Sequence, residues 1–243
     1  MDSLTALLHN EIPAIVMPQF ATPAECRALV ARAREIGFQR YQQVSPPIDR
    51  IGVTVFEYHR IGMAAYFHAA EAARILQRQV FGGSFDPLRR MIELLAANHP
   101  GRVDVAVDPQ FGAYYAGLIR RIEAGTLLHV DFAAAEHSGW HVASVGSQLA
   151  WNVYLDLEGG EVGVTHVHDR SWQPPCERFK LPDSYGYRRD VLDGAGCFSY
   201  RPHVGELCII NTRNFHEVEP STGARVTFTS ALGSFGDDLC LWS

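Results

Sequence analysis

From about Val103 onward the sequence is a succession of short apolar runs separated by turn residues, and this pattern limits the folds open to the chain. Asp108-Pro109, Asp193-Gly194 and Thr222-Gly223 mark three of the turns, and Glu158-Gly159-Gly160 marks a fourth. Short strands separated in this way are typical of a sandwich or barrel of antiparallel strands. We predict strands at 103–107, 114–123, 127–132, 148–157, 161–166, 185–192, 197–200, 205–211, 215–219 and 225–232.

The first hundred residues are instead predicted to be mainly helical. Thr22-Pro23-Ala24-Glu25 is a capping box with proline at the first helical position, and it predicts a helix that ends at Gly37. We expect helices at 3–10, 23–36, 62–79 and 86–97, and strands at 14–17 and 51–58. No linker or repeat divides the chain. We therefore expect residues 1–243 to form a single domain, with a helical flanking region at 1–100 outside a β-core at 103–235.

Composition is that of an average globular protein, with 47% hydrophobic and 20% charged residues. The net charge of -6 argues against nucleic acid as the main partner, because neutralising phosphate needs a basic face. Five cysteines without a C-x-x-C motif indicate free thiols in a reducing compartment. The N-terminus shows no signal-peptide pattern, and no apolar run approaches the ~20 residues that span a bilayer. We expect a cytoplasmic protein with no membrane partner, and the sequence does not predict its oligomeric state.

A histidine and an aspartate lie two residues apart in the apolar run 127–132. If this run is a strand, residues i and i+2 point to the same face, so His129 and Asp131 present an imidazole and a carboxylate to one point. That is two-thirds of the 2-His-1-carboxylate triad of non-haem Fe(II) sites. Alone the pattern is weak, because such pairs are also common on solvated strand faces.

Two residues far downstream give the pattern more weight. His216 follows an apolar strand and a short turn, and Arg225 comes nine residues later in a run of β-branched residues. An arginine in an apolar strand destabilises the fold unless its charge is paired. A bound dicarboxylate is a suitable partner, because guanidinium holds a carboxylate with two parallel hydrogen bonds. His203 has a poorer strand context than His216, so we do not expect it to be a metal ligand.

The order His129-x-Asp131, His216, Arg225-x-Thr227 resembles the Fe(II)/2-oxoglutarate-dependent oxygenase pattern H-x-D…H…R-x-S/T, and the resemblance covers about residues 110–235. The turn at 158–161 and the strand at 205–207 also lie where that superfamily often has them. The resemblance implies a mainly β fold with flanking helices, built on a double-stranded β-helix (a jelly-roll, cupin-like core). It also implies that His129, Asp131 and His216 hold Fe(II), that Arg225 and Thr227 bind the 2-oxoglutarate co-substrate, and that O2 is consumed.

A narrower resemblance links the chain to the carrier-free amino-acid halogenases and hydroxylases. It rests on 128–132, on Gln148-Leu149-Ala150-Trp151-Asn152-Val153-Tyr154 and on Glu158-Gly159-Gly160-Glu161. Halogenases of that group have glycine where Asp131 stands, which leaves room for chloride on iron. The resemblance therefore implies a hydroxylase that acts on an unactivated C–H of a small molecule, a free amino acid or a derivative.

Substrate contacts are less well defined by the sequence. Trp151 and Asn152 alternate in one strand, so one of them faces the cavity, although a tryptophan there is also a natural core residue. Arg120 can bind a substrate carboxylate or take a structural ion pair. We add His137 and Trp242 as candidate contacts. His166, His168 and Asp169 form a second cluster, which we read as a loop cluster rather than a metal site.

Two other functions stay open at this point. The same cofactor chemistry can desaturate, cyclise or halogenate, although the carboxylate of Asp131 disfavours halogenation. A jelly-roll can also serve as a non-catalytic metal-binding sensor, because a fold does not determine a function. The substrate, the carbon attacked and the stereochemistry are not readable from the sequence.

Overall fold

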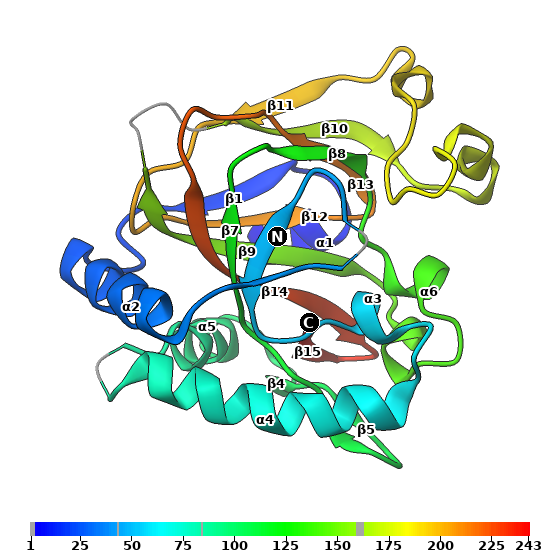
Figure 1. Cartoon of the computed structure of the whole chain (residues 1–243). Helices are drawn as coiled ribbons and strands as arrows, with labels where there is room; N and C mark the ends of the chain where they lie inside the picture. The colour runs from blue at the N-terminus through cyan, green and yellow to red at the C-terminus, as the bar shows by residue number, and fades with distance from the viewer. Residues whose placement is uncertain (1–2, 43, 84, 159–162) are drawn as a thin grey trace.

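Two antiparallel sheets lie face to face, with helices packed on the outer side of the larger one (Figure 1). The computed structural model describes residues 3–42, 44–83, 85–158 and 163–243. In these ranges the larger sheet runs β1-β12-β9-β14-β7-β3-β2, with β15 and β4 joined to it through β14, and the smaller sheet runs β11-β10-β13-β8. Every pair in the two sheets is antiparallel except β15 with β4.

The bounds of the elements are as follows. The strands are β1 (Ala14–Met17), β2 (Gln39–Arg40), β3 (Ile48–Ile51), β4 (Val103–Val105), β5 (Val107–Asp108), β6 (Gly112–Ala113), β7 (Leu118–Ile122), β8 (Thr126–His129), β9 (Gln148–Leu157), β10 (Thr165–Ser171), β11 (Cys197–Tyr200), β12 (Leu207–Asn211), β13 (Asn214–Val218), β14 (Arg225–Phe235) and β15 (Asp238–Trp242). The helices are α1 (Ser3–Leu8), α2 (Pro23–Ile36), α3 (Val55–Tyr58), α4 (Met63–Phe81), α5 (Pro87–Ala96) and α6 (Ala133–Glu136), with 3-10 helices η1 (His141–Ser144), η2 (Pro174–Phe179) and η3 (Arg189–Leu192).

The chain crosses repeatedly between the two sheets from β7 to β14. β7, β9, β12 and β14 lie in the larger sheet, whereas β8, β10, β11 and β13 lie in the smaller one. This winding is that of a double-stranded β-helix, so the predicted jelly-roll core is confirmed. It places the end of β8 beside β13, and therefore His129 near His216. That residues 1–243 make up a single domain stays a prediction.

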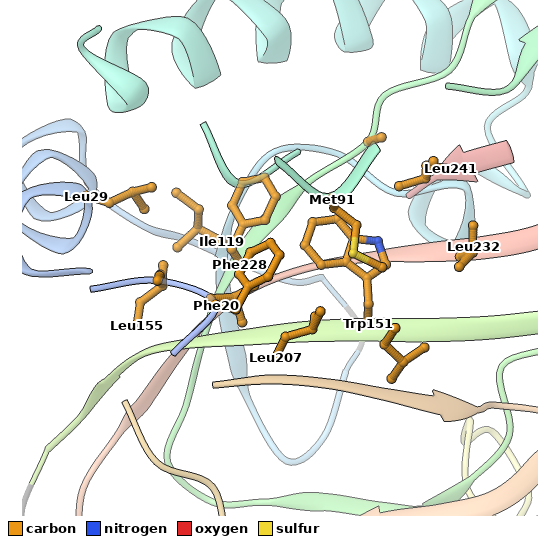
Figure 2. Packing of buried hydrophobic residues seen from close by; sticks show 14 of the residues in the cluster. Phe20, Leu29, Met91, Ile119, Trp151, Leu155, Leu207, Phe228, Leu232 and Leu241 are labelled. Carbon is orange, nitrogen blue, oxygen red and sulfur yellow. The ribbon is translucent and has the colours of Figure 1, made fainter. Parts of the chain in front are cut away.

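The main core fills the space between the larger sheet and the helices. Figure 2 shows Trp151 of β9 and Phe228 of β14 in this space, where their rings lie 5.5 Å apart. Leu29 of α2 and Met91 of α5 belong to the same cluster and enter it from the helical side. The predicted capping box of α2 is present, since the Thr22 side chain accepts from the Glu25 amide while the Glu25 carboxylate accepts from the Thr22 amide. None of the helices in the described ranges is long and apolar enough to cross a membrane.

Most predicted helices and strands are present, but two segments predicted as strands, 51–58 and 185–192, are mainly not strands. The segment 51–58 contains only the end of β3, followed by α3, because the Thr54 hydroxyl caps the Glu57 amide at 3.3 Å and starts a helix. Residues 185–192 form no strand but end in η3, whose Val191 packs on Phe215 instead of pairing with another strand. The strand β15 was not predicted. The expected turn at 158–161 falls mainly on residues 159–162, which lie outside the described residues.

Because Trp151 is fully buried in this core, we expect Trp151→Ala to lower the free energy of unfolding by about 3–5 kcal/mol. The measurement is urea unfolding followed by circular dichroism. Val107→Ala is the control, since Val107 is 51% exposed and should change stability by no more than about 0.5 kcal/mol. A Trp151→Ala protein as stable as the control would contradict this placement of the indole.

Candidate metal and co-substrate site

The pairing of β8 with β13 brings the two predicted histidine ligands together. His216 and His129 are direct partners across these strands, and their rings lie 4.2 Å apart. Asp131 follows β8, and its amide donates to the Thr212 carbonyl at 2.9 Å. Its Oδ2 lies 3.9 Å from His129 Nε2 and 3.7 Å from His216 Nε2. One atom from each side chain falls within 4.8 Å of the others, a spacing that can hold a metal ion.

Both imidazoles are oriented by the backbone in the same way. His129 Nδ1 bonds to the Leu127 carbonyl at 2.8 Å, and His216 Nδ1 bonds to the Asn214 carbonyl at 2.9 Å. A carbonyl can only accept, so in each ring Nδ1 carries the proton and Nε2 keeps its lone pair. Outer hydrogen bonds of this kind fix the tautomer and orientation of histidines that bind metals. The two lone pairs therefore point towards the Asp131 carboxylate and the space between the three side chains.

The charges at this site suit a divalent cation. Burial, together with the neighbouring His216, lowers the pKa of His129 to about 4, so its imidazole is neutral near pH 7. Desolvation acts to raise the pKa of Asp131, but the neighbouring His216 and His129 outweigh it and hold that pKa well below its usual range. Two neutral imidazoles and one carboxylate are the donor set of the 2-His-1-carboxylate triad. The residues present therefore fit Fe(II).

Arg225 lies at the start of β14 with its charge unpaired. Its side chain is buried, and its Nη1 donates to Thr165 Oγ1 at 3.1 Å. Its Nε has no hydrogen-bond partner, and no carboxylate of the described residues lies within ion-pair distance. Burial lowers the pKa of this guanidinium. Thr227, two residues on, is buried on the same side of the strand. An unpaired buried cation is strongly unfavourable unless a ligand compensates it, so these residues fit a dicarboxylate such as 2-oxoglutarate.

A cavity of about 170 Å³ opens beside the cluster. His129 and Asp131 form part of its wall, and the Asp131 side chain is 46% exposed there. The cavity also has polar and apolar walls. Its polar lining comes from Tyr41, Thr54, Arg120, Thr126, Glu136, His137, Gln148, Tyr185, Thr229, Ser230 and Ser243, and its apolar lining from Val44, Ile48, Val55, Phe56, Leu118, Val130, Ala150, Ala231 and Trp242.

Three of the predicted substrate contacts, Arg120, His137 and Trp242, line this cavity. Trp151 does not, because alternation along β9 turns its ring into the core on the helical side, so its prediction as a substrate contact is wrong. Asn152 points the other way, into the space between the sheets, but it is not part of the cavity wall.

The second histidine cluster lies on β10 of the smaller sheet and not in a loop, so its prediction as a loop cluster is wrong, and His168 is buried. His166 Nε2 pairs with Glu219 at 2.9 Å, and His168 Nε2 pairs with Glu217 at 3.2 Å. Within the described ranges these residues and Asp169 form no group with metal-ligand spacing. His203 is also away from the site and pairs with Glu206.

Glu136 is one of several wall residues that the sequence did not predict. It ends α6, and its carboxylate accepts from the Phe132 amide at 3.2 Å. Burial, helped by the charge of Asp131, raises the pKa of Glu136 to about 8. The signal available in the sequence was a lone acidic residue five positions after Asp131, in an otherwise alanine-rich segment.

Comparison with known proteins places the chain among oxygenases. No family model matches it. A protein of the leucinostatin biosynthesis cluster of Purpureocillium lilacinum, protein S, is 34% identical over 218 residues, which cover 83% of this chain and 88% of that protein. The L-γ-glutamyl-L-propargylglycine hydroxylase of Streptantibioticus cattleyicolor is 26% identical over 208 residues, with 81% and 75% covered.

Solved structures show the same fold. The N-substituted L-amino acid dioxygenase of Burkholderia ambifaria superposes with a TM-score of 0.68 at 16% identity, covering 99% of this chain and 90% of that enzyme. A second structure of that enzyme contains α-ketoglutarate, which is 2-oxoglutarate. The chain belongs to the Fe(II)/2-oxoglutarate-dependent oxygenases. The oxygenase is therefore an enzyme that requires Fe(II), 2-oxoglutarate and O2, and the predicted family and cofactors are confirmed.

We expect His216→Ala to weaken metal binding by the oxygenase at least about 100-fold, because loss of a ligand should exceed the effect of losing an outer contact. The measurement is titration calorimetry with Ni(II) under anaerobic conditions. His203→Ala is the matched control and should bind as the unmodified protein does, since the His203 side chain is 74% exposed and pairs with Glu206. Unchanged affinity in His216→Ala would remove His216 from the site.

Proposed function

We propose that the chain is a hydroxylase in which His129, Asp131 and His216 hold Fe(II), and Arg225 with Thr227 binds 2-oxoglutarate. The convergence of two imidazoles and one carboxylate on a single point, beside a cavity, is the observation that carries this proposal. When bound, Fe(II) with 2-oxoglutarate and O2 converts a C–H to C–OH, while the co-substrate becomes succinate and CO2. The residues of the chain hold and orient the reactants.

Arg225 has the role of receiving the carboxylate of 2-oxoglutarate that lies away from the metal. Its Nε is unpaired, and the hydroxyl of Thr165 occupies only one of its donors. A carboxylate bound here would form two parallel hydrogen bonds and neutralise a charge that is otherwise buried alone. Thr227 would add a hydroxyl contact from the same side of β14.

Asp131 favours hydroxylation over halogenation. Its carboxylate lies within 4 Å of both histidine Nε2 atoms and so fills the position that chloride would need. Desaturation and cyclisation use the same residues and differ only in how the substrate is placed. A sensor without turnover is disfavoured by the unpaired Arg225, because a metal sensor has no need of a buried site for a dicarboxylate.

The substrate is proposed to be a small amino acid or a derivative of one. The relative from S. cattleyicolor hydroxylates L-γ-glutamyl-L-propargylglycine, as its name states, and the enzyme from B. ambifaria acts on N-substituted L-amino acids. The cavity of about 170 Å³ also limits the substrate to a small molecule. We further propose a cytoplasmic location without nucleic acid or membrane partners, which the net charge of -6 and the free state of Cys26, Cys176, Cys197, Cys208 and Cys240 support.

Anaerobic addition of Fe(II) and 2-oxoglutarate is expected to give a weak metal-to-ligand charge-transfer band in the visible. Titrating 2-oxoglutarate against this band measures its dissociation constant. Arg225→Lys should weaken binding on the order of tenfold, because lysine cannot offer a bidentate fork. Arg121→Lys, on the outward side of β7, should have no effect. The proposal fails if no band appears and His129→Ala leaves metal binding unchanged.

Asp131→Gly is expected to abolish hydroxylation while retaining some 2-oxoglutarate binding through Arg225, because the carboxylate ligand is lost and Arg225 is not. Product formation by mass spectrometry, with and without chloride, checks this. A chlorinated product would show that the vacated position accepts chloride. Hydroxylation at the unmodified rate would show that Asp131 is not a ligand.

A further inference from the structure

Two titratable side chains in the cavity wall, the guanidinium of Arg120 and the carboxyl group of Glu136, have no ionic partner among the described residues. Arg120 donates from Nη2 to Thr229 Oγ1 at 3.2 Å, but its buried Nε bonds to nothing. Glu136 accepts from the Phe132 amide, and no cation of the described residues lies within ion-pair distance of it. Both residues line the cavity. A protein rarely leaves both a cation and an acid without a partner at one site unless a ligand supplies the missing groups.

The two side chains enter the cavity from different parts of the fold. Arg120 is an inward residue of β7 in the larger sheet, whereas Glu136 ends α6 after the smaller sheet. His129 and Asp131 line the same cavity as these two side chains. A ligand held by both side chains therefore lies beside the candidate metal site.

The co-substrate does not account for Arg120. Of the two carboxylates of 2-oxoglutarate, one is next to the metal in the proposed site and the other is assigned to Arg225. Arg120 and Arg225 lie near each other in the interior, and the charge of Arg120 contributes to the lowered pKa of Arg225. Two neighbouring guanidinium groups repel unless anions separate them, so a second carboxylate-bearing ligand would relieve this repulsion.

The rest of the wall is apolar on one side. Residues 44–56, from the segment after β2 into α3, contribute much of it, and β7 and β15 contribute the remainder. Its side chains are Val44, Ile48, Val55, Phe56, Leu118 and Trp242. Such a surface suits an aliphatic side chain rather than a polar one.

We propose that Arg120 binds the carboxylate and Glu136 binds the free, protonated amino group of an α-amino acid whose aliphatic side chain lies on the apolar wall. This inference rests on the proposed hydroxylase function and narrows its substrate class. It separates the chain from the similar B. ambifaria enzyme, which acts on N-substituted L-amino acids. An acyl group on the nitrogen removes the positive charge that Glu136 would bind.

L-Leucine, N-acetyl-L-leucine and L-leucine methyl ester are suitable probes, because they share a side chain and differ in one charge each. Each is titrated anaerobically into the protein loaded with Fe(II) and 2-oxoglutarate, and the change in the charge-transfer band gives its dissociation constant. We expect L-leucine to bind at least about tenfold more tightly than either derivative, since each derivative loses a charge-assisted contact.

The variants assign each end of the probe to one residue. Glu136→Gln should reduce the preference for L-leucine over N-acetyl-L-leucine to less than about threefold and leave the preference over the methyl ester. Arg120→Gln should instead reduce the preference for L-leucine over the methyl ester and leave the preference over N-acetyl-L-leucine. Glu123→Gln and Arg121→Gln are the matched controls, since Glu123 is mostly exposed and Arg121 pairs with it outside the cavity. Arg120→Lys, which keeps the charge, should restore part of the preference over the methyl ester.

The outcomes separate this inference from the proposed function. If the band forms but L-leucine binds no better than its derivatives, or no probe binds, the substrate assignment is overturned and the hydroxylase proposal stands. The assignment is also overturned if Arg120→Gln weakens 2-oxoglutarate alone, because Arg120 then belongs to the co-substrate site. If the band itself is absent, the proposed function fails, and this inference fails with it.

Discussion

The direct pairing of His129 with His216 across β8 and β13 is the constraint on which the site depends. Antiparallel strands fix which residues face each other, so a register shift of one residue would turn one imidazole to the other face of the sheet. Each imidazole is also tied to the carbonyl two residues before it, so position and tautomer are set by the same backbone. The two histidines are therefore held precisely relative to each other although they are far apart in sequence, because the jelly-roll winding makes β8 and β13 neighbours.

The second constraint is the balance of charge inside the barrel. Arg225 and Arg120 enter from adjacent strands of the larger sheet, and within the described ranges neither forms an ion pair. Asp131 is the nearby carboxylate that remains ionised, and its charge is directed at the metal position. Among the described residues, the side chains of the interior therefore supply fewer anions than cations. Binding of acidic small molecules would reduce the repulsion between the guanidinium groups of Arg120 and Arg225 and would also form new hydrogen bonds. This charge distribution favours carboxylate ligands, even in a small cavity.

The sequence predicted the parts of the molecule whose signals are local or ordered along the chain. The capping box of α2, the strand β9 and the order His129, Asp131, His216, Arg225 are of this kind. It failed where two local signals compete, as at Thr54, where strand-like alternation overlaps a helix cap that the structure uses. It also failed for Glu136, because the burial beside Asp131 that raises the pKa of Glu136 is not visible in the sequence. Alternation along β9 predicted that Trp151 and Asn152 face opposite sides, but it did not show that Trp151 faces the core under the helices.

The cavity is built from two kinds of element, core strands and short helices, and this difference explains how related enzymes can keep one reaction and differ in substrate. The proposed metal ligands, Arg225 and Arg120 lie on strands of the core or directly after one, where the register holds them. Phe56, Glu136 and His137 instead come from short helices and their ends, outside the paired strands. Such segments tolerate substitution without disturbing strand pairing. At 16% identity to a solved dioxygenase the fold is preserved, so substitutions in these segments can reshape the cavity without altering the paired strands of the core.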